Sequence, residues 1–155
     1  MTDSKTRLEL ALLLLAVSIF IFFTPFVLGS KQPAIKASVK QNMDFLFEMV
    51  NKYKENHQQP PMTMEQLVNE ARDKRYNKTL FNPILKNSGD AIDRQLVAVY
   101  DKDVYNSLGP DFHGRQYAGK TGYFSDGIKF AIYGHLSDGG LMLDDKGQIL
   151  VLSNN

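Results

Sequence analysis

Two aspartates in the C-terminal half are the residues whose type and spacing best suit a chemical role. Asp111 and Asp126 flank a segment rich in glycine and tyrosine. Carboxylate oxygens supplied by a loop are the hard ligands that bind Ca²⁺ in proteins. The spacing of an EF-hand is absent, however, and three bases in between, His113, Arg115 and Lys120, dilute the negative charge. Asp111 and Asp126 are therefore candidate calcium ligands, with ordinary turn aspartates as the alternative.

The other residues that could do chemistry do not form a catalytic pattern. His57, His113 and His135 are far apart in the sequence and lack the spacing of a metal site, so we expect them in solvated loops. The chain has no cysteine, which excludes disulfides, thiolate metal sites and cysteine nucleophiles. It also has no Gly-x-Ser-x-Gly sequence and no P-loop. We predict that the protein is not an enzyme and uses no cofactor, calcium apart.

A different role is indicated for Glu9, which lies at the start of a strongly apolar segment. Leu10–Leu28 contains no charged residue, and as a helix it would span about 28 Å, close to the hydrocarbon core of a bilayer. A carboxylate at that boundary is costly unless it is paired or reaches the headgroups. Glu9 could reach the headgroups beside Arg7, pair with Lys5 of its own chain, or pair with a base of an adjacent copy.

The apolar segment allows three interpretations: a membrane anchor, a hydrophobic assembly helix or a cleaved secretory signal. The two bases before it and the small residue Gly29 after it fit a signal peptide. The run is longer than the usual apolar core of a signal, however. Pro25, which would end or kink a helix, stands late in it. We favour an anchor or assembly helix over residues 1–29, with residues 30–155 as an exported globular head.

The length and charge of the chain restrict the number of domains and the partners that it can have. The chain has 155 residues and a formal net charge of +1, so one domain and no polyanion-binding surface are expected. The bases are concentrated in residues 31–78, where nine bases and six acids give +3. That excess suits a helix face near lipid headgroups. We therefore expect inner-membrane lipid as a partner, and no nucleic acid.

Residues 34–57 are predicted to form an amphipathic helix. Pro33 suits the first turn of a helix. Thr63 followed by Gln66 has the spacing of a capping box and predicts a second, short helix over Thr63–Val68. The apolar residues of the first helix recur every three or four positions and form one stripe: Ile35, Val39, Met43, Leu46, Met49, Val50 and Tyr53.

The C-terminal half changes to the period of two that is typical of strands. Residues 105–125 are predicted as a long loop, and Gly147 as the left-handed residue of a hairpin turn. The predicted fold class is α+β, with a long N-terminal hydrophobic and amphipathic helix packed on a small antiparallel β-sheet. The predicted strands are Leu96–Tyr100, Gly127–Tyr133, Gly140–Asp144 and Gln148–Ser153.

Several short stretches occur in an order that matches a known family. Lys5–Leu10 places Glu9 at the start of the apolar run, and Pro25 interrupts that run near its end. Tyr105–Asp111 reads Tyr-x-Ser-x-Gly-x-Asp. Other matching positions are Tyr53, Pro60–Thr63, Leu67 and Asn82–Pro83. In order and spacing the chain resembles type IV pilin-like proteins, meaning type IV pilins and the pseudopilins of type II secretion.

The resemblance implies a pilin-like fold and a structural role in a type IV pilus-like or pseudopilus filament. Glu9, Arg7 and Pro25 would then be assembly residues, and the partners would be other copies or other pilin-like subunits. The protein would be a single-pass inner-membrane protein, or part of a periplasmic or extracellular filament. Ser4 and Lys5 stand where the family has glycine and phenylalanine. We therefore expect that Lys5 is not the mature N-terminus.

Two alternatives from other classes remain. The first is a single-pass, membrane-anchored accessory or binding module of an envelope complex, which would not polymerise. The second is a secreted hydrolase, which would need a clustered catalytic constellation that the sequence does not show. The mass of the mature N-terminus would best separate the filament subunit from the accessory module.

Overall fold

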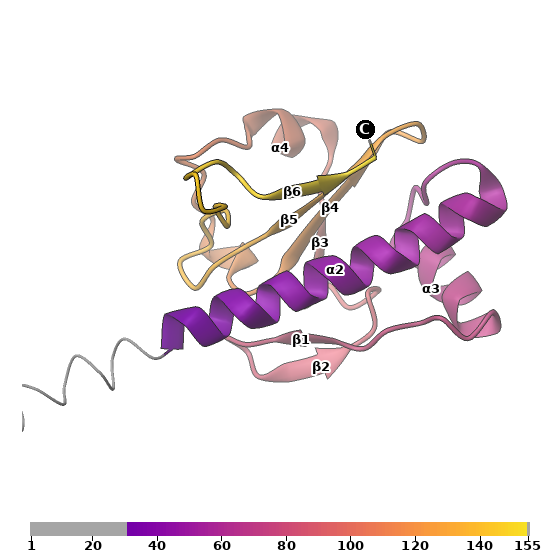
Figure 1. Cartoon of the computed structure of the whole chain (residues 1–155), viewed down its shortest axis with the longest axis horizontal. Coiled ribbons are helices and arrows are strands. Elements are labelled where there is room, and N and C mark those ends of the chain that lie inside the picture. The colour runs from indigo at the N-terminus through magenta and orange to yellow at the C-terminus, as the bar shows by residue number, and fades with distance from the viewer. Residues whose placement is uncertain (1–30, 155) are drawn as a thin grey trace, which may run out of the picture. The chain divides into compact units, whose positions relative to one another are not determined.

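A computed structural model describes residues 31–154, and these residues form an α+β arrangement (Figure 1). A long helix, α2 (Lys31–His57), packs on one face of a four-stranded sheet and also contacts a two-stranded sheet, and a short helix, α3 (Met64–Asp73), follows it. The predicted α+β class, with a long helix packed on a sheet, is confirmed. No helix within residues 31–154 is both long and apolar enough to cross a membrane. The predicted apolar segment, Leu10–Leu28, lies outside the described residues.

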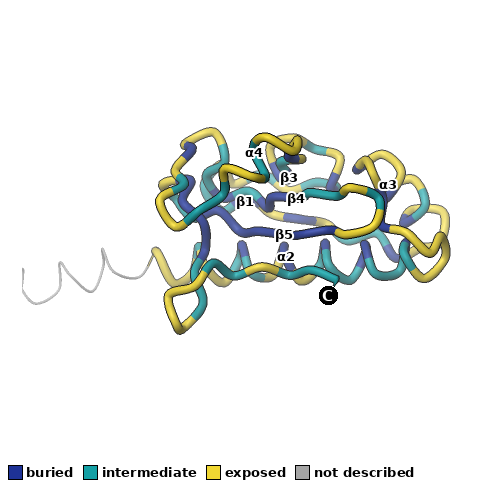
Figure 2. The backbone as a smooth tube through the Cα atoms, turned by 90° about the horizontal axis from the view of Figure 1, so that it is seen from above, coloured by how far each residue is buried: buried dark blue, intermediate teal, exposed yellow. Residues whose placement is uncertain are grey.

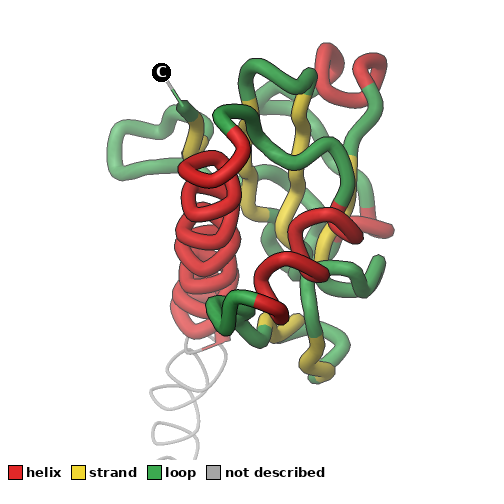
Figure 3. Tube along the Cα trace, turned by 90° about the vertical axis from the view of Figure 1, so that its right-hand side faces the viewer, coloured by secondary structure: helices red, strands yellow, loops and turns green. Residues whose placement is uncertain are grey.

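Helix α2 includes the whole predicted range and buries the predicted stripe from Val39 to Tyr53, whereas Ile35 is only partly buried. It runs alongside the strands of the larger sheet (Figure 3), and the ring of Phe47 lies 5.8 Å from that of Phe130. Gly134 allows the close approach, because a Cβ there would lie 2.6 Å from Cγ1 of Val39. Each large apolar side chain buried in this way contributes about 1.5–3 kcal/mol. The buried residues of α2 are Val39, Asn42, Met43, Leu46, Met49, Val50 and Tyr53.

Asn42 is the buried residue of α2 that the apolar pattern does not predict. It faces the two-stranded sheet, in which β1 (Leu80–Asn82) pairs antiparallel with β2 (Asn87–Gly89). Its Nδ2 donates a hydrogen bond to the carbonyl of Phe81 at 2.7 Å, and its Oδ1 accepts from the N–H of Phe81 at 3.0 Å. A buried amide needs such partners. These two bonds fix α2 to β1.

Helix α3 confirms the predicted capping box. Thr63 is the N-cap: its Oγ1 accepts from the N–H of Gln66 at 3.2 Å, and Oε1 of Gln66 accepts from the N–H of Thr63. The helix continues to Asp73, so it is longer than the predicted stretch Thr63–Val68. Burial of Ala71 in the core and an ion pair from Arg72 to Asp90 stabilise the extra turn.

The four-stranded sheet is mixed. Its first two strands run parallel and the remaining pairs run antiparallel, so the predicted antiparallel sheet is wrong for one pair. The connection over residues 100–120 carries the chain back to the end of the sheet at which the first strand begins, which makes the next strand parallel to it. In spatial order the strands are β3 (Val97–Val99), β4 (Thr121–Ser125), β5 (Phe130–Gly134) and β6 (Val151–Ser153).

That connection is not the long loop that the sequence predicts. It contains helix α4 (Lys102–Ser107) and the 3₁₀ helix η1 (Arg115–Tyr117), and strand β4 follows. Asp101 is the N-cap of α4, with its side chain accepting from the N–H of Val104 at 2.8 Å. Figure 2 shows β5 buried along its whole length, because helix α2 covers one face and this connection lies over the other.

The predicted strand bounds and the predicted hairpin turn are only partly confirmed. Strand β5 starts at Phe130 rather than Gly127, because residues 126–129 form the turn from β4. Gly147 has a φ of +75°, as the predicted turn requires. The segment 140–144, however, forms only isolated bridges, such as the one that joins Leu143 to Ile149, and is not a strand.

Candidate binding site beside the edge strand β3

The three predicted assembly residues cannot be located in the structure. Glu9, Arg7 and Pro25 lie outside the described residues. Their role therefore stays a prediction from the sequence.

The structure does not bring the two predicted calcium ligands together. Asp126 lies in the turn between β4 and β5, where its Oδ1 accepts from the N–H groups of Ile128 and Lys129 at 2.9 and 2.7 Å. These bonds lower the pKa of its carboxyl group. Asp111 lies by the other end of β5, since the ring of the adjacent Phe112 contacts His135 just after that strand. Residues 31–154 contain no group of three or more acidic or histidine side chains placed to hold a metal ion.

His135 is buried, so the expectation of a solvated loop histidine is wrong for it. Its Nδ1 lies 2.9 Å from the carbonyl of Gly139, which can only accept, so Nδ1 carries the proton. Its Nε2 then accepts from the hydroxyl of Tyr100. Burial lowers the pKa of His135 to about 4 and raises that of Tyr100. The His135 ring also stacks on the ring of Tyr117, with the ring centroids 5.0 Å apart. His135 therefore holds the connection between β3 and β4 against the sheet and does not present a reactive group.

An open edge of the sheet provides a different kind of site. Strand β3 is the first strand of the sheet and has a neighbour only on the β4 side. The carbonyl of Leu96 accepts from Thr121, and the N–H of Tyr100 donates to the carbonyl of Tyr123. Alternate residues of a parallel strand bond to the same neighbour. The N–H and C=O of Val99 therefore point away from β4, toward the open edge.

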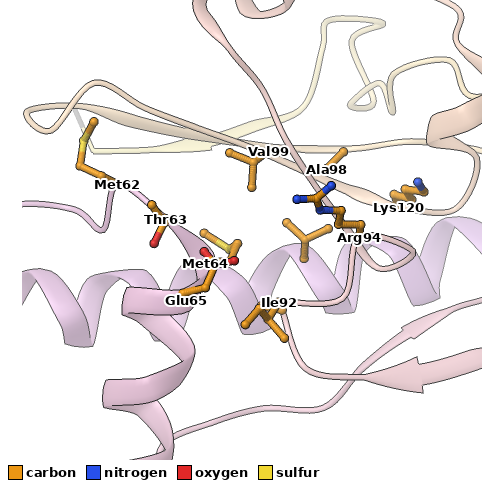
Figure 4. A pocket seen from close by; sticks show the side chains of 11 residues that line it. Met62, Thr63, Met64, Glu65, Ile92, Arg94, Ala98, Val99 and Lys120 are labelled. Carbon is orange, nitrogen blue, oxygen red and sulfur yellow. The ribbon is translucent and has the colours of Figure 1, made fainter.

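A groove lies along this edge and is apolar over much of its length (Figure 4). Val99 shares a sheet face with the buried Val97 but is 53% exposed. Met62, just before α3, is 49% exposed, and Ile92 is 40% exposed. Both line the groove together with Val99, and the cavity has a volume of about 430 Å³.

Two cations lie together in the groove. The side chains of Arg94 and Lys120 are on the side away from Met62 (Figure 4). Within residues 31–154, neither side chain makes an ion pair or a hydrogen bond. Glu65, at the start of α3, also lines the groove. The site therefore combines free backbone groups, apolar side chains and two unpaired cations.

Sequence reasoning found only part of this groove. The apolar run over residues 96–100 predicts a strand, and in a strand Val99 shares the face of Val97. It does not show that the strand is at an edge, because that depends on which strands pair. Met62, Ile92 and Arg94 lie in turns, where no period marks them.

The comparisons with known proteins do not add a family. No family model matches the chain, and no curated protein or solved structure is significantly similar to it. The resemblance to pilin-like proteins is therefore carried by the order and spacing of short stretches alone.

Proposed function

We propose that this chain is a pilin-like structural subunit, anchored in the inner membrane through residues 1–29 and assembled with other copies or other pilin-like subunits into a pilus-like or pseudopilus filament. The observation that supports this proposal best is helix α2, whose apolar stripe is buried on the chain's own sheet. Because the stripe is buried within the head, it is not available for contacts with other subunits. Contacts between subunits would then fall to the apolar segment Leu10–Leu28 and to the surfaces of the heads.

Glu9 gives the proposal a specific test. A carboxylate at a membrane boundary favours a basic partner, because an unpaired ion is costly in a low dielectric. Lys5 is four residues before Glu9 and would share its helix face, so a bond within one chain competes with a bond between copies. Arg7 is two residues away and would not share that face, which leaves it for a neighbouring copy.

Cross-linking in membranes distinguishes these arrangements. The chain has no cysteine, so an Ala16→Cys background allows a specific disulfide between neighbouring apolar segments. We expect Glu9→Ala to abolish this cross-link while the protein still inserts. Glu55→Ala, which removes an exposed carboxylate of α2, is the matched control and should leave the cross-link intact. A cross-link that survives Glu9→Ala would remove the main support for a filament guided by this glutamate.

The groove beside β3 favours a second candidate, an anchored binding module of an envelope complex that does not polymerise. Exposed apolar side chains and unpaired cations at a sheet edge are typical of a recognition surface. This candidate predicts that the chain stays a single copy in membranes, so that the Ala16→Cys background with Glu9 intact gives no cross-link at any density of the protein in the membrane. The intact mass is a further discriminator, since removal of residues 1–4 with a methylated amine would favour the filament subunit.

A further inference from the structure

We propose that the groove beside β3 binds an extended segment of a partner protein, which pairs with β3 as an additional strand and places an acidic side chain against Arg94 and Lys120. This inference concerns the ligand chemistry of the head. It holds whether the chain forms a filament or acts as a single anchored module, so the two proposals can fail separately.

The backbone of β3 supplies the first part of the recognition. The N–H and C=O of Val99 and the C=O of Val97 point to the open edge, whereas the N–H of Val97 already donates to the carbonyl of Asp93 at 3.0 Å. An added strand would satisfy these three groups in a regular ladder. Such a short ladder gives little affinity by itself, so side chains must supply the rest.

The apolar wall supplies the second part. Val99, Met62 and Ile92 are each at least 40% exposed and line the same cavity. An added strand would project alternate side chains over Val99, continuing the face on which Val97 is buried. The cavity, at about 430 Å³, has room for only a few side chains. We therefore expect β-branched or other compact apolar residues at alternate positions of the ligand.

The two cations determine the sign of the charge that the ligand must carry. Arg94 and Lys120 line the groove together and have no acidic partner within residues 31–154. A guanidinium and an ammonium group beside each other repel, and a carboxylate between them removes that repulsion. Glu65 lines the same groove and disfavours a second acid near α3. One acidic residue in an otherwise apolar extended segment is thus the chemistry that fits.

A second copy of this chain fits less well. The other open edge of its sheet is β6, and Val151–Ser153 contains no acidic residue. Pairing β6 of one copy with β3 of the next would leave Arg94 and Lys120 without a carboxylate. For pairing through β6, charge complementarity therefore favours a different protein over a second copy.

Synthetic heptapeptides test the proposal on the full chain in detergent micelles. Each peptide consists of valine and threonine with one glutamate, and the glutamate is moved through all positions. Matched sets carry one lysine or one glutamine instead. Fluorescence anisotropy should find at least one glutamate peptide that binds about tenfold more tightly than its lysine counterpart. N-methylation of alternate amides on the ladder edge of that peptide should abolish binding, because it removes the strand pairing.

Variants of the groove localise the binding. Val99→Asp should weaken binding of the best glutamate peptide by about tenfold or more, since it puts a charge in the apolar wall and repels the ligand. Ile128→Asp is the matched control, because Ile128 is 76% exposed and lies in the turn between β4 and β5. Arg94→Glu should shift the preference toward the lysine peptides, whereas Arg115→Glu, an exposed arginine of η1, should not. Both groove variants change exposed side chains, so they should fold.

Three results would overturn the proposal. The first is that no peptide binds below about 1 mM, a free energy of binding of only about −4 kcal/mol. The second is equal binding of glutamate and lysine peptides, or binding that Val99→Asp leaves unchanged. The third is self-association of the chain without peptide that Val99→Asp reverses, because the occupant of the edge would then be a second copy.

Discussion

The two faces of the four-stranded sheet are packed in different ways. The face toward α2 and α3 is covered by helices and consists mainly of aliphatic and methionine side chains, such as Leu46, Met43 and Ile132. The opposite face is covered by the connection between β3 and β4. It is built from aromatic rings around His135, and the ring of Tyr105 stacks on Phe124 at 3.9 Å with an interplanar angle of 8°.

This difference shows that one sheet can be stabilised by two kinds of interaction. The helix face depends on the burial of apolar area, which is largely independent of pH. The aromatic face depends in addition on a buried hydrogen-bonded pair, Tyr100 and His135, that holds only while the imidazole is neutral. The two faces should therefore respond differently to the same perturbation.

A charge on the helix face should have the largest effect. Leu46 is fully buried in α2, so Leu46→Asp buries an unpaired carboxylate and removes apolar contacts. We expect a loss of about 4 kcal/mol or more in the free energy of unfolding. Urea unfolding of a fragment of residues 30–155, which we expect to fold as a soluble monomer, would measure it. Gln41→Asp, at an exposed position of the same helix, should cost less than about 0.5 kcal/mol. Equal midpoints for the two variants would show that the stripe does not face the core.

Acidification should weaken the aromatic face next. The pKa of His135 is lowered to about 4 by burial, compared with 6.5 for an ordinary histidine. Between these values the unfolded chain binds a proton that the folded chain excludes, so stability is full above a pH of about 6.5 and falls as the pH drops toward about 4. The shift corresponds to about 3 kcal/mol. Urea unfolding at a series of pH values would measure the loss.

A variant identifies the group responsible for that loss. His135→Gln keeps an amide that can donate to the Gly139 carbonyl and accept from Tyr100, but it does not titrate. It should be less stable than the wild type at neutral pH and show a much flatter pH dependence above a pH of about 4. A slope that persists unchanged in His135→Gln would assign the acid sensitivity to another group and remove this distinction between the two faces.

The same contrast explains what the sequence could predict of the fold. The stripe of α2 repeats at helical spacing and the cap of α3 lies within four residues, so both are visible locally. The aromatic face is not local: Tyr100 and His135 are 35 residues apart. Without knowledge of that pair, residues 105–125 read as an irregular loop. The parallel pairing of β3 with β4 was missed for the same reason.

The candidate groove was even less visible. Its residues come from the start of α3, from a turn, from β3 and from the residue before β4. No local period connects Met62, Arg94 and Lys120. The sequence could indicate that Val99 lies in a strand, but the pairing of the whole sheet decides that this strand has an open edge.

The smallest expected effect compares a single aromatic contact on each face. Tyr105 stacks closely on Phe124, whereas Phe47 of α2 meets Phe130 at 5.8 Å and a tilt of 48°. An aromatic pair contributes about 0.5–1.5 kcal/mol beyond its buried area, and that part is lost when one ring becomes an aliphatic chain. We expect Tyr105→Leu to lower the free energy of unfolding by about 1 kcal/mol and Phe47→Leu by less, because leucine packs well among the aliphatic neighbours of α2. Thermal unfolding of the two single variants would measure both losses in the free energy of unfolding. The double variant should lose the sum of the two, because the contacts lie on opposite faces of the sheet. A larger loss for Phe47→Leu would show that ring stacking does not distinguish the two faces.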